Sequence, residues 1–315
     1  MIRSVAAAFS LAAGPAFAHG DVILDSESIW RSWAFDPVTI LLLIAAQWLY
    51  GRGVLRLRHR LGRPAHGLDG RNAAFFAAGQ AFLVIALVSP LEALSGAMLS
   101  AHMIQHVILV ALAPPLLILG QPEVAWLHGL PRRWRGSVAR GSVRNAFARL
   151  APLGRPIPAA LLHAAAMWIW HAPALFDAAL ARDWLHWLEH ACFFGTALLF
   201  WRAVFKAAQA RSLAPVGVAI CLLTVLQSGF LGALLTFAKH PLYQGAASGL
   251  RGLTALEDQQ LAGLIMWVPM GMVYMIAGLL VGARLLDEAE PSSGRTVAVP
   301  APRSHARPDP GGPVP

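Results

Sequence analysis

Seven apolar runs alternate with polar, arginine-rich segments along the chain, and this pattern predicts its architecture. A bilayer core is about 30 Å thick, so a helix needs about 20 mostly apolar residues to cross it. Apart from closed barrels, only helices satisfy every backbone polar group within lipid. The sequence therefore predicts an all-α, polytopic membrane bundle of seven transmembrane helices. The predicted spans lie at residues 37–55, 72–89, 98–119, 157–170, 184–204, 215–237 and 260–281.

The distribution of basic residues predicts the orientation of these spans. Twenty Lys and Arg residues lie around the inner ends of the first, third, fifth and seventh spans and in the segments that follow them, whereas four lie on the opposite side. Cytoplasmic loops of membrane proteins carry an excess of Lys and Arg. The chain is thus predicted to be N-out/C-in.

The two ends of the chain differ from the apolar runs between them. The first residues combine a basic start, an Ala, Leu and Phe-rich middle and a final Ala-Phe-Ala, as in a secretory signal peptide. The last residues are rich in Pro, Gly, Ser and Arg and lack apolar periodicity, which is typical of disorder. The predicted organisation is a signal peptide at 1–18, a periplasmic segment at 19–36, a transmembrane domain at 37–283 and a disordered cytoplasmic tail at 284–315.

Composition agrees with this architecture and excludes some classes of protein. The chain is 57% hydrophobic and only 13% charged, as expected for a protein surrounded by a lipid bilayer. The formal net charge of +9 arises in the segments between apolar runs, so it does not indicate a nucleic-acid partner. Cys192 and Cys221 lie in separate apolar runs and fit no zinc or redox spacing.

Histidines near the outer ends of three predicted spans are the strongest functional signal. Ionisable residues are unfavourable inside a bilayer, so they indicate a function by default. His102 and His106 lie four residues apart in the third span, and His186 and His190 have the same spacing in the fifth. Residues at this spacing project from one face of a helix. With His171 at the end of the fourth span, we expect five imidazoles to converge near the periplasmic surface.

This set of histidines predicts a metal site. Imidazoles that face an oxidising compartment, without a Cys pair, favour copper over structural zinc. Nearby methionines favour Cu(I), because thioether sulfur selects that ion. A hydrogen-bonded network between helices is the alternative for the same histidines. Additional candidate ligands are His19, Met98, His163, Met266 and Asp258.

Known catalytic patterns are missing from the sequence, so no enzymatic activity is predicted. We find no nucleophile elbow, no phosphate-binding glycine loop and no His-Glu-x-x-His segment. His-x-x-Glu-His at 186–190 resembles an inverted zinc-peptidase motif, but a motif of five residues also occurs by chance.

Short segments spread over the chain carry a resemblance to a known family. The most distinctive are His-Met-Ile-Gln-His at 102–106, Trp-His-Ala-Pro-Ala-Leu-Phe at 170–176 and His-Trp-Leu-Glu-His at 186–190. Further pieces are Phe-Asp-Pro at 35–37, Ser-Pro-Leu at 89–91, Ala-Pro-Pro-Leu-Leu-Ile-Leu-Gly at 113–120, Pro-Leu-Tyr at 241–243 and Asp-Gln-Gln-Leu-Ala-Gly-Leu-Ile-Met-Trp at 258–267. In order and spacing, they resemble the membrane CtaG-type cytochrome c oxidase assembly factors associated with caa-type oxidases. The resemblance covers about residues 30–283.

The resemblance implies a plasma-membrane protein that is needed to mature a haem–copper oxidase at its copper centres. The implied partners are cytochrome c oxidase subunits or a periplasmic copper chaperone. We expect the outer histidines to bind copper and hand it on. Similar segments occur in copper-uptake proteins of the CopD type, so copper transport stays open as an alternative. Haem binding, with histidines as axial ligands, is a third hypothesis.

Overall fold

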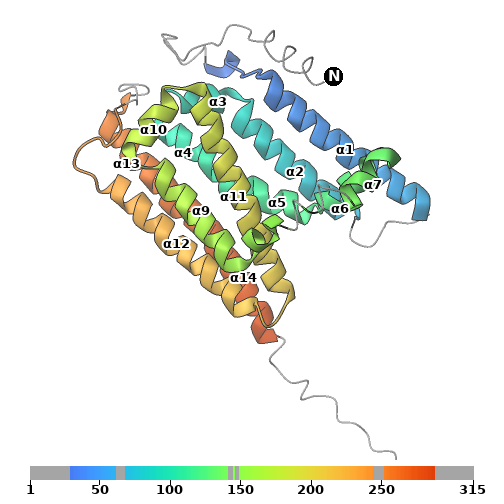
Figure 1. Ribbon diagram of the computed structural model, residues 1–315. Coiled ribbons are helices and arrows are strands. Elements are labelled where there is room, and N and C mark those ends of the chain that lie inside the picture. The colour runs from blue at the N-terminus through green and yellow to red at the C-terminus, as the bar shows by residue number, and fades with distance from the viewer. Residues whose placement is uncertain (1–28, 62–67, 141–144, 146–148, 245–251, 288–315) are drawn as a thin grey trace, which may run out of the picture.

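The chain forms a bundle of helices in a computed structural model, which describes residues 29–61, 68–140, 145, 149–244 and 252–287 (Figure 1). Every element within those residues is helical, so the prediction of an all-α fold is confirmed. The predicted signal peptide, the residues that follow it up to 28, and the tail from 288 lie outside the described residues. The candidate ligand His19 lies outside them as well.

The helices follow one another with short connections. In chain order they are η1 (Ile29–Arg31), α1 (Pro37–Leu61), α2 (Gly70–Leu87), α3 (Pro90–Ser95), α4 (Leu99–Val107), η2 (Ile108–Leu112), α5 (Ala113–Leu119), α6 (Pro122–Gly129), α7 (Arg132–Arg140), η3 (Ala151–Gly154), α9 (Pro156–Trp170), α10 (Pro173–Leu180), α11 (Asp183–Gln209), α12 (Ala214–Thr236), α13 (Ala255–Ile265), η5 (Met266–Met270) and α14 (Gly271–Asp287). Two of these elements, η2 and η5, are π-helical segments inside longer helices.

Each of the seven predicted apolar runs coincides with a helix or a continuous series of helical segments. Within the described residues, six stretches are long and apolar enough to cross a membrane, namely Pro37–His59, Gly70–Leu87, Leu99–Leu119, Asp183–Gln209, Ala214–Thr236 and Ala255–Leu286. The pair α9 and α10 passes the same test together, although it is bent by 74°. The structure thus supports six spans, or seven if this bent pair is one span.

Pro173 explains the bend between α9 and α10. A residue that precedes proline is disfavoured in the α conformation. Ala172 accordingly has φ −63° and ψ 127°, and α9 ends at Trp170. The bend leaves His171 at the C-terminal end of α9, where its side chain turns into the bundle.

The continuous helix α4–η2–α5 lies between two hydrophobic cores. Residues of α1, α2 and α6 form one core with it, around Tyr50, Phe76 and Leu117. Residues of α9, α11, α12, α13 and α14 form the other, around Met103 and Phe200. Figure 1 shows α1, α2 and α6 on one side of the molecule and α9, α12 and α14 on the other.

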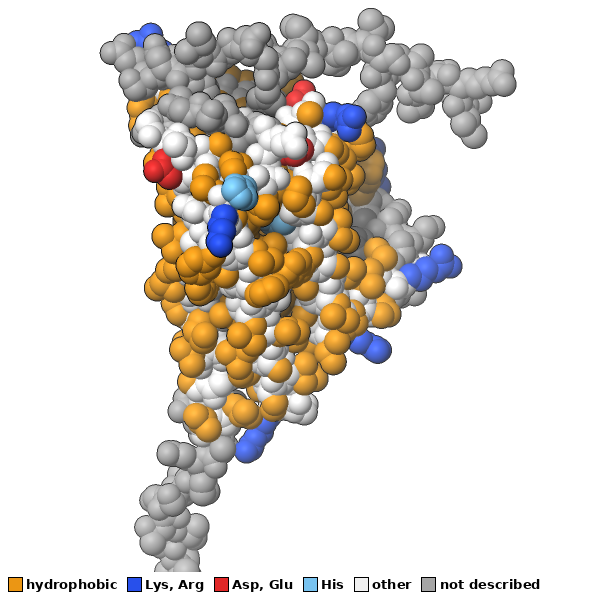
Figure 2. Space-filling model, turned by 90° about the vertical axis from the view of Figure 1, so that its left-hand side faces the viewer, with side chains coloured by type: hydrophobic (Ala, Val, Ile, Leu, Met, Phe, Trp, Pro, Cys, Tyr) orange, Lys and Arg blue, Asp and Glu red, His pale blue; other side chains and the backbone are white. Residues whose placement is uncertain are grey.

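The outer surface is apolar, as expected for helices that face lipid. Leu41 on α1, Leu226 on α12 and Leu279 on α14 each expose at least 65% of their surface. Figure 2 shows hydrophobic side chains over most of one face, with few Lys and Arg side chains, most of them near its edges. These features support a multi-pass membrane protein. The N-out/C-in orientation stays a prediction.

Asp258 fixes the start of α4, although it lies on α13. The backbone amide of Leu99 donates to Asp258 Oδ2 at 2.6 Å, and that of Ser100 donates to Oδ1 at 3.2 Å. The Ser100 hydroxyl donates to the same Oδ1 at 2.5 Å. Met98, which precedes α4, offers no capping side chain. A carboxylate is favourable at a helix N-terminus, so Asp258 supplies the missing cap and holds α4 in place.

Candidate metal centre

The five predicted histidines lie together inside the bundle. We call His102, His106, His171, His186 and His190 the histidine cluster. His102 and His106 come from α4, His186 and His190 from α11, and His171 from the end of α9. All five are buried, with exposed fractions of 0 to 9%. Helical spacing therefore brought each pair to one face, and helix packing brought the faces together.

The imidazole rings are close enough to share one ion. The ring centroids of His102 and His106 are 4.2 Å apart, and those of His186 and His190 are 4.1 Å apart. Between the two helices, His102 lies 5.4 Å from His186, and His106 lies 5.7 Å from His190. His171 is 5.9 Å from His106. The rings thus surround one small region.

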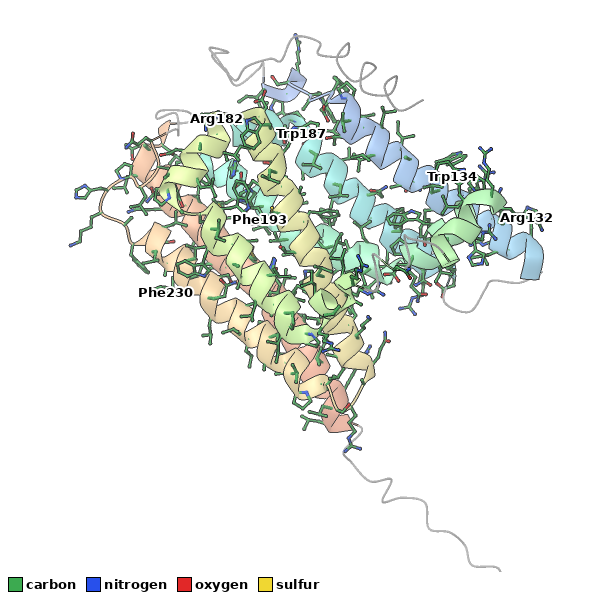
Figure 3. The ribbon with its side chains drawn as sticks, viewed as in Figure 1. Arg132, Trp134, Arg182, Trp187, Phe193 and Phe230 are labelled. Carbon is green, nitrogen blue, oxygen red and sulfur yellow. The ribbon has the colours of Figure 1, made fainter. Side chains whose placement is uncertain are left out.

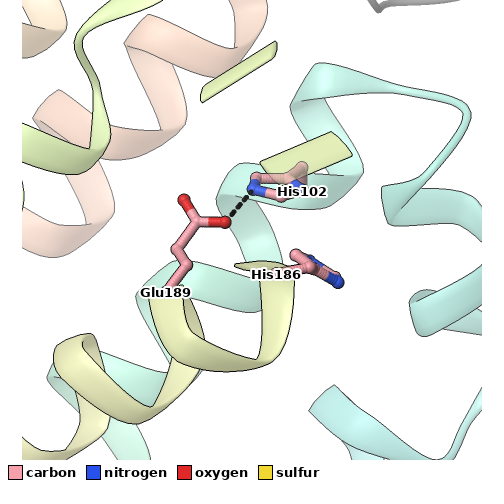
Figure 4. Close-up of side chains that lie close together, drawn as sticks. All are labelled: His102, His186 and Glu189. Atoms are coloured by element: carbon pink, nitrogen blue, oxygen red, sulfur yellow. Dashed lines mark ion pairs between the residues drawn. The ribbon is translucent and has the colours of Figure 1, made fainter. Parts of the chain in front are cut away.

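Glu189 places a carboxylate within the histidine cluster. It lies on α11 between His186 and His190 and is fully buried. Its Oε2 is 3.9 Å from His102 Nε2, and its Oε1 is 3.7 Å from His106 Nε2. Figure 4 shows Glu189 facing His102, with His186 beside them. One donor atom from each of these three residues lies within 4.8 Å of the other two.

Several polar atoms of this region have no hydrogen-bond partner. Among the described residues, none pairs with Nε2 of His102, His106, His171 or His190, or with either carboxylate oxygen of Glu189. Buried polar atoms are normally paired, because leaving them unpaired costs about 1–3 kcal/mol each. The donor types fit a metal ion, which would satisfy these atoms together.

Outer contacts orient two of the imidazoles. His171 Nδ1 lies 2.7 Å from the carbonyl oxygen of Met167. A carbonyl only accepts, so Nδ1 carries the proton and Nε2 keeps its lone pair for a ligand role. His186 Nδ1 lies 3.8 Å from Glu92 Oε1. A carboxylate behind a ligating histidine is a frequent arrangement in metal sites.

Glu92 belongs to α3, the short helix between two predicted spans. Gln105 Nε2 donates a hydrogen bond to Glu92 Oε2 and another to the carbonyl of Ala86 at 2.7 Å. Burial raises the pKa of Glu92 to about 7, and the bond from Gln105 opposes this rise. Gln105 thereby connects Glu92 to α4, the helix that carries two histidines of the cluster.

Aromatic rings cover the histidine cluster. Phe176 lies 5.0 Å from His102, and Phe193 lies 4.6 Å from His106, both in edge contacts. Figure 3 shows Phe193 within the bundle, below Trp187 and Arg182. Tyr243 packs against Phe176 with ring centroids 4.2 Å apart, and its hydroxyl donates to the carbonyl of His171 at 3.0 Å. These contacts hold the end of α9 and enclose the donor atoms.

His163 lies in a separate polar network rather than in the histidine cluster. Its Nε2 is 2.9 Å from the Tyr274 hydroxyl, and its Nδ1 is 3.2 Å from Thr196 Oγ1. Tyr274 and Trp201 both donate to the carbonyl of Val110, within the π-helical segment η2. Both ring nitrogens of His163 therefore have protein partners, which explains its burial without a ligand.

The other additional candidates occupy different positions. The carboxylate of Asp258 accepts three hydrogen bonds from α4. Met98 is the buried residue before α4, and Met266 is the buried first residue of η5. Their role as ligands stays a prediction.

Sequence reasoning gave too little weight to two carboxylates. Glu189 stands in the His-x-x-Glu-His segment, so its helical position already placed it near the histidines. Glu92 lies in a short segment between spans, with no periodicity that would point to α11. The assembled donors are imidazole nitrogens and a carboxylate, which suit transition-metal ions.

Comparison with known proteins identifies the family. The family model described as cytochrome c oxidase caa3 assembly factor (Caa3_CtaG) matches residues 48–288. Uncharacterized proteins of Mycobacterium bovis (Mb0105) and Mycobacterium tuberculosis (MT0111) are each 27% identical over 212 residues. The match covers 60% of this chain but only 30% of each relative, so the chain spans about a third of their length. No solved structure matches this chain.

Proposed function

Because the chain belongs to the cytochrome c oxidase caa3 assembly factor family, we propose that it binds copper at the histidine cluster and hands it on during oxidase assembly. Its partners would be oxidase subunits that receive the ion, or a periplasmic copper chaperone that delivers it. In the proposed N-out/C-in topology, the histidine cluster faces the periplasm of a bacterial inner membrane.

One observation carries this proposal. Nitrogen and oxygen atoms of His102, His106 and Glu189 face one another at 3.7–3.9 Å while buried from solvent. These separations are too long for hydrogen bonds. They therefore favour ligands grouped around an ion over the alternative of a hydrogen-bonded network.

The proposed mechanism is exchange of ligands around the ion. His102 and His106, on one face of α4, form the primary clamp. His190, His186 or His171 completes the coordination from the neighbouring helices. A partner protein would replace these ligands one at a time, so the ion would move without covalent chemistry in this chain. We accordingly propose no enzymatic activity.

The double variant His102→Ala/His106→Ala tests the site. It removes both ligands of the primary clamp, so copper that co-purifies with the protein should fall at least tenfold. Oxidase activity and oxidase copper content should fall with it, while the amount of protein in the membrane is unchanged. The control is His240→Ala, an exposed histidine outside the histidine cluster. A double variant that still supports a fully copper-loaded oxidase would refute the site assignment.

Copper transport of the CopD type is the second candidate function, because His163, Thr196 and Tyr274 add polar groups within the bundle. Copper uptake by proteoliposomes would distinguish transport from delivery at one surface. Haem binding is less favoured, since ring centroids 4.1–6.4 Å apart surround a space suited to one small ion.

A further inference from the structure

We infer that Glu189 is a direct metal ligand and that the histidine cluster takes up a divalent transition-metal ion rather than Cu(I). This inference rests on the proposed function, because it concerns the ion held at the same site. It differs from the sequence-based expectation, which relied on methionine sulfur.

The position of Glu189 fits a ligand. Its carboxylate is fully buried, and neither oxygen has a hydrogen-bond partner among the residues that the structure describes. Both oxygens instead face Nε2 atoms, one of His102 and one of His106. A buried carboxylate without a hydrogen bond is strongly unfavourable, so this one requires a proton or a cation.

The spacing of the donor atoms fits a shared ion. Ligand atoms at about 2.0–2.2 Å from a tetrahedral ion are about 3.3–3.6 Å from one another. Glu189 Oε1 lies 3.7 Å from His106 Nε2, and Glu189 Oε2 lies 3.9 Å from His102 Nε2. Donor atoms of His102, His186 and Glu189 lie within 4.8 Å of one another, so these side chains would have to move closer together to complete the coordination.

The charge around the site matches two positive charges. Among the described residues, Glu189 and Glu92 are the carboxylates in ion-pair contact with the histidine cluster. Glu92 also accepts a hydrogen bond from Gln105. Neither carboxylate pairs with Lys or Arg within the described part of the chain. With neutral imidazoles, ionised Glu189 and Glu92 would balance both charges of a divalent ion, whereas Cu(I) would balance only one of them.

The types of donor lead to the same conclusion. Carboxylate oxygen is a hard ligand that suits divalent ions, whereas Cu(I) is selected by thiolate and thioether sulfur. A site of imidazoles and one carboxylate is common for Zn(II), and Cu(II) binds such ligands more tightly in the general order of affinities. Glu92, behind His186, would act as a positioning residue, in the way that outer carboxylates orient ligating histidines.

Metal titration of the purified full-length protein tests the inference. Protein freed of metal by a chelator is titrated with Cu(II), with Zn(II), and anaerobically with Cu(I). The wild type should bind one divalent ion per chain, and Glu189→Gln should weaken Cu(II) and Zn(II) binding at least tenfold while changing Cu(I) affinity less than threefold. Glu189→Asp should retain part of the divalent affinity, because it keeps the carboxylate.

The matched control is Glu257→Gln, because Glu257 is exposed and Gln also suits its capping position in α13. Melting curves of the metal-free variants establish that each is folded. The shift of the wild-type melting temperature on adding Zn(II) gives a second measure of divalent-ion binding, and it needs no Glu189 variant. The inference is overturned if Glu189→Gln binds divalent ions as tightly as the wild type, or if only Cu(I) shifts the wild-type melting temperature. In either case the proposed function stands as long as His102→Ala/His106→Ala abolishes copper retention and oxidase maturation.

Discussion

At the scale of single residues, the polar groups of the histidine cluster form an inner set that faces the centre of the cluster, and further polar groups lie behind them. Imidazoles of α4, α9 and α11 and the carboxylate of Glu189 point at one another. Behind them, the carbonyl of Met167 lies 2.7 Å from His171 Nδ1, and Glu92 lies 3.8 Å from His186 Nδ1. The Met167 carbonyl thereby decides which nitrogen of His171 is available to an ion.

Because the pKa of Glu92 is raised, we expect the free energy of unfolding of the metal-free protein to depend on pH. Burial raises its pKa from 4.5 to about 7, so the folded state binds a proton more tightly than the unfolded state does. The resulting stabilisation is complete below pH 4.5 and is lost as the pH rises through 7. In the wild type, this loss lowers the free energy of unfolding by on the order of 2 kcal/mol between pH 5 and 8, and Glu92→Gln should remove it.

Chemical unfolding in detergent at several pH values measures this effect. Glu257→Gln makes the same substitution at an exposed glutamate and should leave the pH profile unchanged over that range. If the profile of Glu92→Gln parallels that of the wild type between pH 5 and 8, Glu92 does not control this dependence.

The grouping of the histidines could be predicted from the sequence, whereas the contribution of Glu189 and Glu92 to the same site could not. A four-residue spacing fixes the face of a helix, so the pairs on α4 and α11 followed from the sequence alone. The distance between Glu92 and His186 depends on how α3, which packs against α4, is placed relative to α11. That geometry is a property of packing, which a pattern along one segment does not contain.

At the scale of elements, the fold depends on breaks and close approaches as much as on regular helices. The apolar runs gave the position of every long helix, but not the 74° bend after α9 or the π-helical turns of η2 and η5. The bend follows from Pro173 and η5 contains Pro269, whereas η2 accepts hydrogen bonds from other helices. The Val110 carbonyl in η2, for example, accepts from Trp201 and Tyr274, which are distant in sequence.

The helices α12 and α13 pass so close to each other at Gly263 that even an added methyl group there should destabilise the protein. A Cβ atom added at Gly263 would lie 2.5 Å from Thr236 Oγ1 and 2.6 Å from the carbonyl oxygen of Gly232. Gly263→Ala should therefore force the two helices apart and lower the free energy of unfolding by about 1–3 kcal/mol. Gly271→Ala is the matched control, because no atom lies within 4 Å of the corresponding position. Equal unfolding free energies for the two variants would show that the helices do not cross this closely.

At the scale of the whole molecule, one end carries the histidine cluster and another carries the arginine-rich helix α7. Figure 3 places Arg182 and Trp187 near the former, and Arg132 and Trp134 on α7. Arg56 of α1 donates to the carbonyls of His128, Gly129 and Leu130, so it connects α1 to the end of α6. This asymmetry agrees with a cytoplasmic position for the arginine-rich side.

Cysteine labelling in intact cells tests the orientation. In a background without Cys192 and Cys221, Lys239→Cys between α12 and α13 should react with a membrane-impermeant maleimide from outside. Arg133→Cys on α7 should react only after the membrane is opened, because the excess of Arg predicts a cytoplasmic location. The reverse pattern would place the histidine cluster on the cytoplasmic side.

The enclosure of the donor atoms has a consequence for the timing of delivery. His102 and Glu189 are fully buried, whereas the side chains of His186 and Glu92 expose 10% and 19% of their surface. In the proposed function, an ion held by the innermost donors would leave past these two partly exposed side chains. Local opening of the protein, rather than the strength of the metal–ligand bonds, would then set how long the ion stays bound. The enclosed site would keep the ion away from competing ligands until a recipient protein binds.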